Sequence, residues 1–136
     1  MKRRVFLGSA LALFLGAPAL AGGETVDYEP GVIADLLAEG KTVFVDYAAS
    51  WCNTCKAQER AITALRTANP AYDQALTFVR VDWDDFGSHA VATSRNIPRR
   101  STLLVLKGDA ELGRIVAGTR KSDIQALMDT GLNAAS

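Results

Sequence analysis

The sequence predicts one α/β domain in which a central mixed sheet of four to five strands is flanked by helices on both faces. Three observations predict this fold class. Stretches with the composition of strands alternate along the chain with stretches of helical periodicity. Residues 42–48 include apolar side chains in succession, as expected for a parallel strand covered on both faces. Two later strands are separated only by a short turn and therefore form an antiparallel hairpin.

The first elements of the domain are a weak strand, a helix and a buried strand. Residues 25–28 are the weak strand. In residues 31–39 apolar side chains recur at helical spacing behind Pro30, whose missing N–H suits the first turn, and Gly40 ends the helix. Because its apolar residues do not alternate with polar ones, we place the strand at residues 42–48 in the centre of the sheet.

A long helix, a second strand and a short helix follow. The long helix begins at the two cysteines, continues to about Arg66 and is broken at Asn69-Pro70. Residues 76–83 are mainly apolar and β-branched, which predicts the second strand. A short, weakly marked helix is expected at residues 88–94.

The C-terminal part predicts a hairpin and a final helix. Residues 102–106 form the most apolar strand, the turn lies at residues 108–109, and residues 111–117 return beside it. Ser122 is the expected N-cap of the final helix, which we expect to end before Gly131.

Residues 1–21 have the three parts of a bacterial signal peptide. A basic start at residues 2–4 precedes an apolar run at residues 5–15, and residues 19–21 offer a small-residue cleavage site. The apolar run falls short of the roughly 20 residues that a membrane anchor needs. We therefore expect cleavage and a periplasmic domain of residues 22–136. The adjacent arginines also fit a twin-arginine signal, so that route and the general secretory route both stay open.

Composition limits the classes of partner. The segment 1–21 contains three of the 15 basic residues and none of the 15 acidic ones, so the remaining 115 residues carry a net charge near −3. A chain of this length supports one hydrophobic core. The charge does not favour nucleic acid or an anionic membrane surface as a partner. We expect a monomer.

The chain has two cysteines, Cys52 and Cys55, three positions apart. A disulfide that closes so short a loop restricts the unfolded chain very little and is a poor structural staple. A disulfide between two such cysteines is better suited to repeated reduction and re-formation. The spacing therefore indicates a redox function.

Cys52 falls where the buried strand passes through a short loop into the long helix. The unpaired N–H groups and the dipole of a helix N-terminus stabilise a thiolate and lower the pKa of a cysteine there. Cys52 is therefore the expected nucleophile. Cys55, one turn later, should be less exposed and should attack the mixed disulfide formed at Cys52.

Asp46 is a carboxylate within an otherwise apolar central strand. Burying it ionised costs several kcal/mol, so we expect a raised pKa. Such a group can accept the proton of the resolving thiol as a general base. The alternative is a solvated or hydrogen-bonded carboxylate at the end of the strand.

Residues 43–56 resemble the active site of the thioredoxin superfamily, with Asp46 six residues before Cys52 and Trp51 directly before it. More narrowly, the WCNTCK run, with no later proline in its helix, resembles the C-terminal thioredoxin-like domain of the periplasmic electron transporter DsbD. The likeness extends over nearly all of residues 22–136.

The resemblance implies a thioredoxin fold and a redox-active disulfide between Cys52 and Cys55, with no other cofactor. It also implies a proton-relay role for Asp46 and a packing role beside the disulfide for Trp51. We expect substrate contacts from Trp51, Asn53, Thr54, Arg100 and Ser101.

The sequence departs from the family at one position. The family places a cis-proline directly before the strand that begins here at Thr102, where it faces the cysteines and pairs with the substrate backbone. Here that position is Ser101, preceded by Arg99 and Arg100. A non-proline cis bond costs about 2.5–4 kcal/mol, so we expect a trans bond at Ser101 and an altered docking loop. The two arginines are candidates for recognising an acidic partner.

Other uses of a CxxC pair are less favoured. A closed zinc site needs four ligands and only His89 is left to join the cysteines, while covalent haem needs a histidine where Lys56 stands. We therefore expect no metal. The serious alternative is a non-catalytic binding module of the same fold, such as a metal carrier or a chaperone.

Within the enzyme class, a reductase of protein disulfides is favoured. Asn53 and Thr54 are neutral and add none of the thiolate stabilisation that makes a strong oxidant. An oxidising periplasm would then require a membrane electron donor of DsbD or CcdA type.

Overall fold

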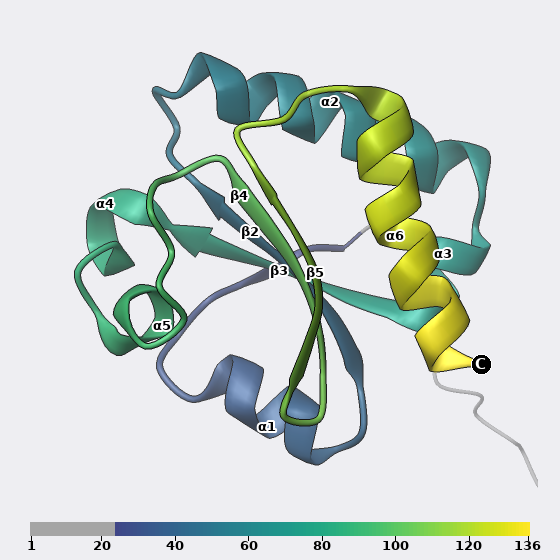
Figure 1. Cartoon of the computed structure of the whole chain (residues 1–136), viewed down its shortest axis with the longest axis horizontal. Helices are drawn as coiled ribbons and strands as arrows, with labels where there is room; N and C mark the ends of the chain where they lie inside the picture. Colours follow the sequence, from purple (N-terminus) through teal and green to yellow (C-terminus); the bar gives the residue numbers. More distant parts are fainter. Residues whose placement is uncertain (1–23) are drawn as a thin grey trace, which may run out of the picture.

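The central sheet of the protein has five strands in the order β1-β3-β2-β4-β5 (Figure 1). The computed structural model describes residues 24–136. The strands are β1 Val26–Asp27, β2 Thr42–Ala48, β3 Leu76–Asp82, β4 Thr102–Lys107 and β5 Ala110–Val116. β1, β3 and β2 are parallel, whereas β4 pairs antiparallel with both β2 and β5. The sheet is therefore mixed, as predicted, and β2 is its middle strand.

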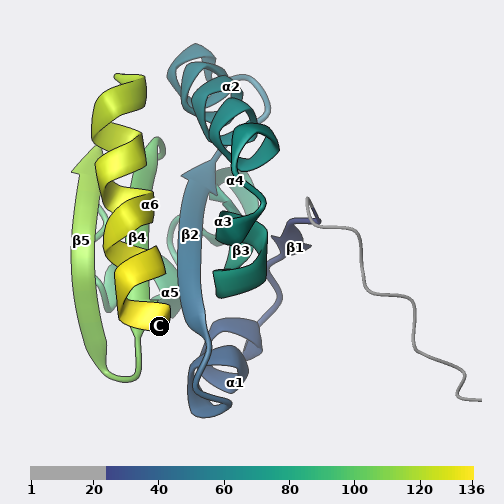
Figure 2. The ribbon, with the colours of Figure 1, turned by 90° about the vertical axis from the view of Figure 1, so that its right-hand side faces the viewer.

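Helices cover both faces of this sheet (Figures 1 and 2). They are α1 Val32–Ala38, α2 Asn53–Ala68, α3 Ala71–Ala75, α4 Trp83–Phe86, α5 Ala90–Thr93 and α6 Lys121–Ala135. α2, α3 and α6 pack on one face, and α1, α4 and α5 lie on the other. The predicted fold class is thus confirmed.

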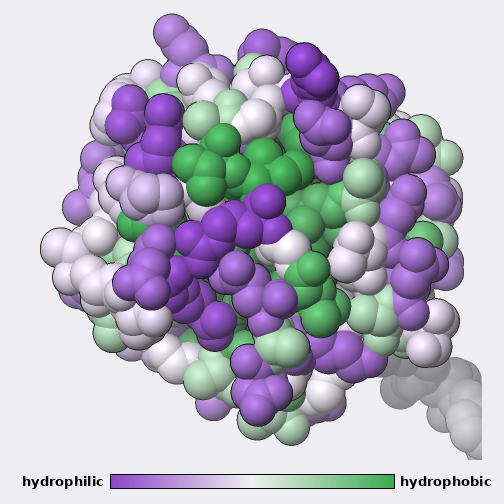
Figure 3. All heavy atoms as spheres, in the orientation of Figure 1, coloured by the Kyte–Doolittle hydropathy of each residue, from purple (hydrophilic) through white to green (hydrophobic). Residues whose placement is uncertain are grey.

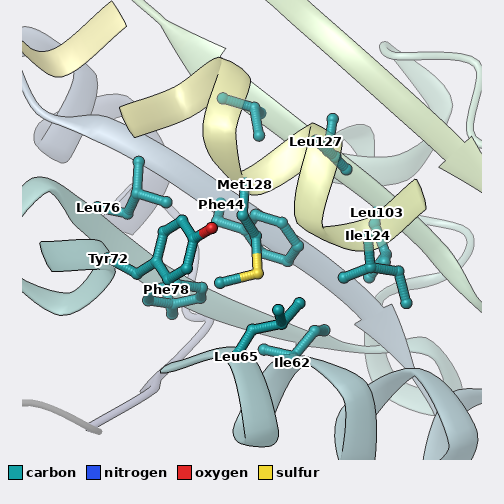
Figure 4. Packing of buried hydrophobic residues seen from close by; sticks show 11 residues of the cluster. Phe44, Ile62, Leu65, Tyr72, Leu76, Phe78, Leu103, Ile124, Leu127 and Met128 are labelled. Atoms are coloured by element: carbon teal, nitrogen blue, oxygen red, sulfur yellow. The ribbon is translucent and has the colours of Figure 1, made fainter. Parts of the chain in front are cut away.

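β2 contributes side chains to both hydrophobic layers, because successive residues of a strand point to opposite faces. Val45 and Tyr47 pack in the layer with α1 and α5. Phe44 packs in the layer with α2, α3 and α6, and burying a side chain of this size contributes about 1.5–3 kcal/mol. Figure 4 shows this second layer, formed by Phe44, Ile62, Leu65, Tyr72, Leu76, Phe78, Leu103, Val105, Ile124, Leu127 and Met128. By alternation, Asp46 faces the same side as Phe44.

The structure departs from the prediction around β3. The strand predicted at residues 76–83 ends one residue earlier, because Trp83 begins α4 and Asp82 caps it by accepting a hydrogen bond of 3.1 Å from the Asp85 amide. The short helix α3, which starts after Pro70, was not predicted either. Both helices are too short to show a helical period in the sequence.

The prediction for the final helix was wrong at both ends. The N-cap is Arg120 rather than Ser122, and α6 continues through Gly131. A Cβ at Gly131 would lie 2.8 Å from a methyl carbon of Leu76 and 3.1 Å from one of Val105. The glycine therefore allows α6 to lie close against the sheet, and this packing outweighs its weak helix propensity.

β5 forms one edge of the sheet and is protected by charge. Glu111 and Arg114 form an ion pair of 2.8 Å on this strand. Arg114 also donates hydrogen bonds to the carbonyl oxygens of Arg95 and Asn96, which joins the hairpin to the segment before β4. Figure 3 shows hydrophilic residues across the middle of the face that β5 crosses in Figure 1. Charged side chains at an edge oppose pairing with another chain.

The predicted signal peptide, residues 1–21, lies outside the described residues, so the boundary of the domain at residue 22 stays a prediction. Among residues 24–136, no helix has both the length and the apolar character needed to cross a membrane.

Gly131→Val should lower the free energy of unfolding by about 1–3 kcal/mol, because the added carbons overpack the contact of α6 with Leu76 and Val105. Urea unfolding followed by circular dichroism measures the change. Ala126→Val, at an exposed position of the same helix, is the control and should cost less than about 1 kcal/mol. Equal losses in the two variants would show that Gly131 is not a packing position.

Candidate active site

Cys52 and Cys55 form a disulfide at the beginning of α2, with their Cα atoms 5.2 Å apart. Cys52 is the N-cap residue, and its sulfur accepts a hydrogen bond of 3.1 Å from the Cys55 amide. The Cys52 carbonyl accepts the hydrogen bond of the Lys56 amide, which starts the helical ladder. The predicted position of Cys52 is therefore confirmed, since its sulfur lies where the helix presents free N–H groups, and its role as nucleophile stays a prediction.

The relative exposure of the two cysteines differs from the prediction. Each is only 3% exposed, so Cys55 is not the more buried of the pair. Ala48 and Ala49 pack with both cysteines, and Trp83 packs against this group. Trp83 begins the unpredicted helix α4, and sequence reasoning placed it in a strand, so its contact with the site was missed.

Ser101 places its hydroxyl beside the disulfide, in contact with both sulfurs. Its Oγ lies 3.2 Å from the sulfur of Cys52 and 3.1 Å from that of Cys55. Every peptide bond of the described residues is trans, as expected for Ser101, but its φ of 62° is in the left-handed region. Ser101 is completely buried, and its amide donates to the Tyr47 carbonyl at 2.7 Å. In this structure the amide is thus not free to pair with a substrate backbone.

Gln58 of α2 holds the loop of Ser101 in place and was not predicted. Its Nε2 donates to the carbonyl oxygens of Ser101 and Gly118, both at 2.9 Å. Gln58 is fully buried and its Oε1 has no hydrogen-bond partner within the described residues. Gln58 recurs at helical spacing with Ile62 and Leu65, so a polar residue on the apolar face of α2 is the signal that could have identified it.

Trp51 lies on the rim of the site and is 55% exposed. Its indole N–H donates to the carboxylate of Asp84, at 3.0 and 3.1 Å from the two oxygens. The guanidinium of Arg100 lies over the indole ring, 4.4 Å from its centroid. Trp83, rather than Trp51, is thus the tryptophan that packs against the buried cysteines. Trp51 lies at the surface between the carboxylate of Asp84 and the guanidinium of Arg100.

The other predicted contact residues surround the cysteines. Asn53 and Thr54 occupy the first turn of α2, where Asn53 is exposed and Thr54 is half-buried. Arg99 donates from Nε to the carbonyl oxygen of Arg100 at 3.0 Å, and both arginines are half-buried. The structure thus brings one cationic side chain, Arg100, onto Trp51 beside the disulfide.

Asp46 lies on β2 and faces a pocket of about 210 Å³ between α2 and the strands β2 and β3. Its Oδ1 is buried and has no hydrogen-bond partner within the described residues. Burial raises the pKa of Asp46 from 3.8 to about 7; the positive charge of Arg80 opposes this rise and the negative charge of Glu59 adds to it. The raised pKa predicted from the sequence is therefore confirmed.

Glu59 was missed in the sequence, although it lies on the pocket that Asp46 faces. It is four residues after Cys55 on α2, and a residue at this spacing lies on the same side of the helix. Arg80 is the residue of β3 that pairs in register with Asp46. The pocket is thus lined by two carboxylates, Asp46 and Glu59, and by two guanidiniums, those of Arg66 and Arg80.

The described residues offer no ready metal site. Among residues 24–136, no three His, Cys, Asp or Glu side chains lie together as a metal would require. His89 is the N-cap residue of α5, and its ring packs edge-on against Phe86 at 5.3 Å. The only sulfur pair in this part of the chain is the disulfide itself.

Comparison with known proteins decides the family. The thioredoxin family model matches residues 31–130. The chain belongs to the thioredoxin family. It is 33% identical to the H-type thioredoxin of Oryza sativa subsp. indica over 99 residues, and this match covers 71% of this chain and 75% of that protein. It is 30% identical to Thioredoxin-1 of Saccharomyces cerevisiae over 91 residues, and this match covers 67% of this chain and 82% of that protein.

The solved structures agree. The crystal structure of Trxlp from Edwardsiella tarda aligns with a TM-score of 0.65 and 30% identity, covering 76% of this chain and 98% of that chain. With the CxxC pair Cys52 and Cys55, the chain is a thiol-disulfide oxidoreductase of thioredoxin type. The narrower resemblance to the DsbD domain stays a prediction.

Asp46→Asn should make the protein more stable at neutral and higher pH. Between about pH 4 and 7 the unfolded state has lost the Asp46 proton while the native state keeps it, so the free energy of unfolding falls as the pH rises. Above pH 7 this loss reaches up to about 4 kcal/mol, and the neutral amide avoids it.

Guanidinium unfolding of the oxidised wild-type protein and of the Asp46→Asn variant at pH 5 and pH 8 measures this effect. The advantage of the variant should be larger at pH 8. Asp109→Asn, at an exposed turn position, is the control and should show no such gain. An advantage of Asp46→Asn that is equal at both pH values would contradict a raised pKa.

Proposed function

We propose that the chain is an exported, periplasmic reductase of protein disulfides that works as a monomer. The observation that carries this proposal is the position of Cys52, whose sulfur caps α2 and is bonded to Cys55. Export is inferred from the signal-like residues 1–21. The WCNTCK run supports the further proposal that this domain is used as the C-terminal domain of DsbD is used, to pass on electrons from a membrane donor.

The first step is attack by the Cys52 thiolate on a substrate disulfide. A new bond forms between Cys52 and one substrate sulfur, and the other substrate sulfur leaves as a thiolate with the electron pair of the broken bond. The Cys55 amide, which donates to the Cys52 sulfur, favours the thiolate that this step needs.

The second step releases the reduced substrate. The thiol of Cys55 loses its proton, and the resulting thiolate attacks the sulfur of Cys52, so that the intramolecular disulfide forms and the substrate leaves as a thiolate. Asp46 is the proposed acceptor of that proton, because a pKa of about 7 matches a general base at neutral pH. In total, two electrons move from the protein dithiol to the substrate.

Electron flow towards the substrate is supported by the residues between the cysteines. Asn53 and Thr54 carry no charge that would stabilise the Cys52 thiolate further and make the couple strongly oxidising. Since the periplasm is oxidising, the proposed donor is a membrane protein of DsbD or CcdA type, which supplies two electrons for each turnover.

A second candidate is a binding module without turnover. The burial of both sulfurs and the contact of Ser101 with each of them favour it, because an incoming disulfide needs access to Cys52. Such a module would bind a ligand or a partner without exchanging its disulfide.

The reduction potential of the Cys52 and Cys55 couple tests the proposal. After equilibration in graded dithiothreitol or glutathione buffers, we expect a potential below about −220 mV and near the thioredoxin value of about −270 mV. Cys52→Ser should abolish reduction of insulin disulfides, and Cys55→Ser should accumulate mixed disulfides. A potential near or above about −180 mV would indicate an oxidase or isomerase instead. A couple that never exchanges would support the binding module.

Arg100→Glu should reduce kcat/KM for disulfide peptides with acidic flanking residues by about three- to tenfold, because a positive charge beside Trp51 is replaced by a negative one. The rate with 2-hydroxyethyl disulfide, which is neutral, should change much less. Arg60→Glu makes the same change of charge at an exposed position of α2 and is the control. Equal effects on acidic and neutral substrates would exclude recognition of acidic partners by Arg100.

A further inference from the structure

A single hydroxyl contacts both redox sulfurs. The Oγ of Ser101 lies 3.2 Å from the sulfur of Cys52 and 3.1 Å from that of Cys55. A disulfide carries no hydrogen on either sulfur, so Ser101 is the donor in both contacts, and its one hydrogen is shared between them. Sulfur in a disulfide is a weak acceptor, whereas a thiolate is a charged and much stronger one.

The position of this hydroxyl is fixed by the backbone of Ser101. The amide donates to Tyr47, and the carbonyl oxygen accepts hydrogen bonds from the Ala117 amide and from Gln58. The residue is completely buried and keeps a left-handed φ of 62°. These bonds hold the hydroxyl beside the sulfurs, so donating to a thiolate requires only a rotation of its hydrogen.

No other side chain competes for this role among residues 24–136. The hydrogen-bond donors to the sulfurs in this part of the chain are the Cys55 amide and the Ser101 hydroxyl. Of the charged groups on the surrounding elements, Arg100 and Asp84 contact Trp51, and Asp46 faces the pocket beside α2. Lys56 on α2 is exposed. The sulfur of Cys55 therefore has Ser101 as its only donor here.

We propose that Ser101 is a catalytic residue that donates a hydrogen bond to each thiolate in turn. In the reduced protein it donates to Cys52, and in the mixed disulfide it donates to Cys55 once that thiol has lost its proton. Ser101 keeps its own proton throughout, and the proton of Cys55 passes to Asp46. The inference rests on the function proposed above and adds a group that stabilises both nucleophiles of that reaction.

The role depends on serine at this position. A proline there would supply neither the hydroxyl nor the amide N–H that Ser101 gives to Tyr47. The departure from the family pattern thus replaces a residue without hydrogen-bond donors by one with two. One donor fixes the loop, and the other faces the reacting atoms.

The thiolate titration of Cys52 tests this role. In chemically reduced protein, the absorbance of the thiolate at 240 nm is followed against pH, with Cys55→Ser as a background in which Cys52 alone titrates. Ser101→Ala should raise the pKa of Cys52 by about one unit, because a hydrogen bond to a charged group is lost. Ser101→Gly removes the same hydroxyl at a backbone angle that glycine tolerates, so it replaces Ser101→Ala if that variant does not fold.

A second readout separates this role from a structural one. In the protein with both cysteines, at a pH above the pKa of Cys52 in both variants, loss of the hydroxyl should shift the equilibrium with glutathione about tenfold towards the disulfide. The reduction potential is then about 30 mV more negative. Ser50→Ala, an exposed serine two residues before Cys52, is the matched control and should change neither quantity.

An unchanged pKa of Cys52 in the serine variant that folds would overturn the inference, whatever the activity. The titration uses chemically reduced protein, so it gives a result even if the wild-type couple does not cycle. Failure to cycle would refute the proposed function, whereas normal cycling with an unchanged pKa would refute only the role of Ser101.

Discussion

The hydrogen bond from the Cys55 amide to the Cys52 sulfur connects the fold of this protein to its chemistry. It is a helix cap, and it satisfies one of the amides that every helix leaves unpaired at its start. It is also a donor to the atom that becomes the nucleophile. Because β2 is the middle strand of the sheet, its neighbours on both sides fix the point at which α2 begins. The sulfur therefore depends on the whole sheet for its position.

The site combines two groups that a stable core would otherwise exclude. The carboxyl of Asp46 lies on a central strand with its Oδ1 unpaired within residues 24–136, and its burial keeps it protonated up to about pH 7. Ser101 is a buried serine with a left-handed backbone. Each is held by neighbours that are themselves well packed, Asp46 beside Phe44 of the core and Ser101 by the bonds to Tyr47 and Gln58. Strained or poorly solvated groups of this kind are common where a fold carries chemistry.

The sequence could predict those parts of the protein that depend on local pattern. The bounds of β2 follow from its apolar run, and the position of Cys52 follows from the step between strand and helix. The short helices α3 and α4 were missed, because four or five residues do not show a period. The end of α6 was misplaced, because glycine disfavours a helix locally and only its contact with Leu76 and Val105 explains why the helix continues.

The sequence by itself therefore determined the fold class, the redox pair Cys52 and Cys55 and the unusual carboxyl of Asp46, since each follows from residue type and spacing along one segment. Only the tertiary structure decided what surrounds them. Trp83 packs against the cysteines while Trp51 faces solvent, and the hydroxyl of Ser101, 46 residues from Cys55, contacts both sulfurs. Such contacts join segments far apart in the chain, and no local periodicity records them, because they arise only when β4 pairs with β2 and brings its preceding loop to the start of α2.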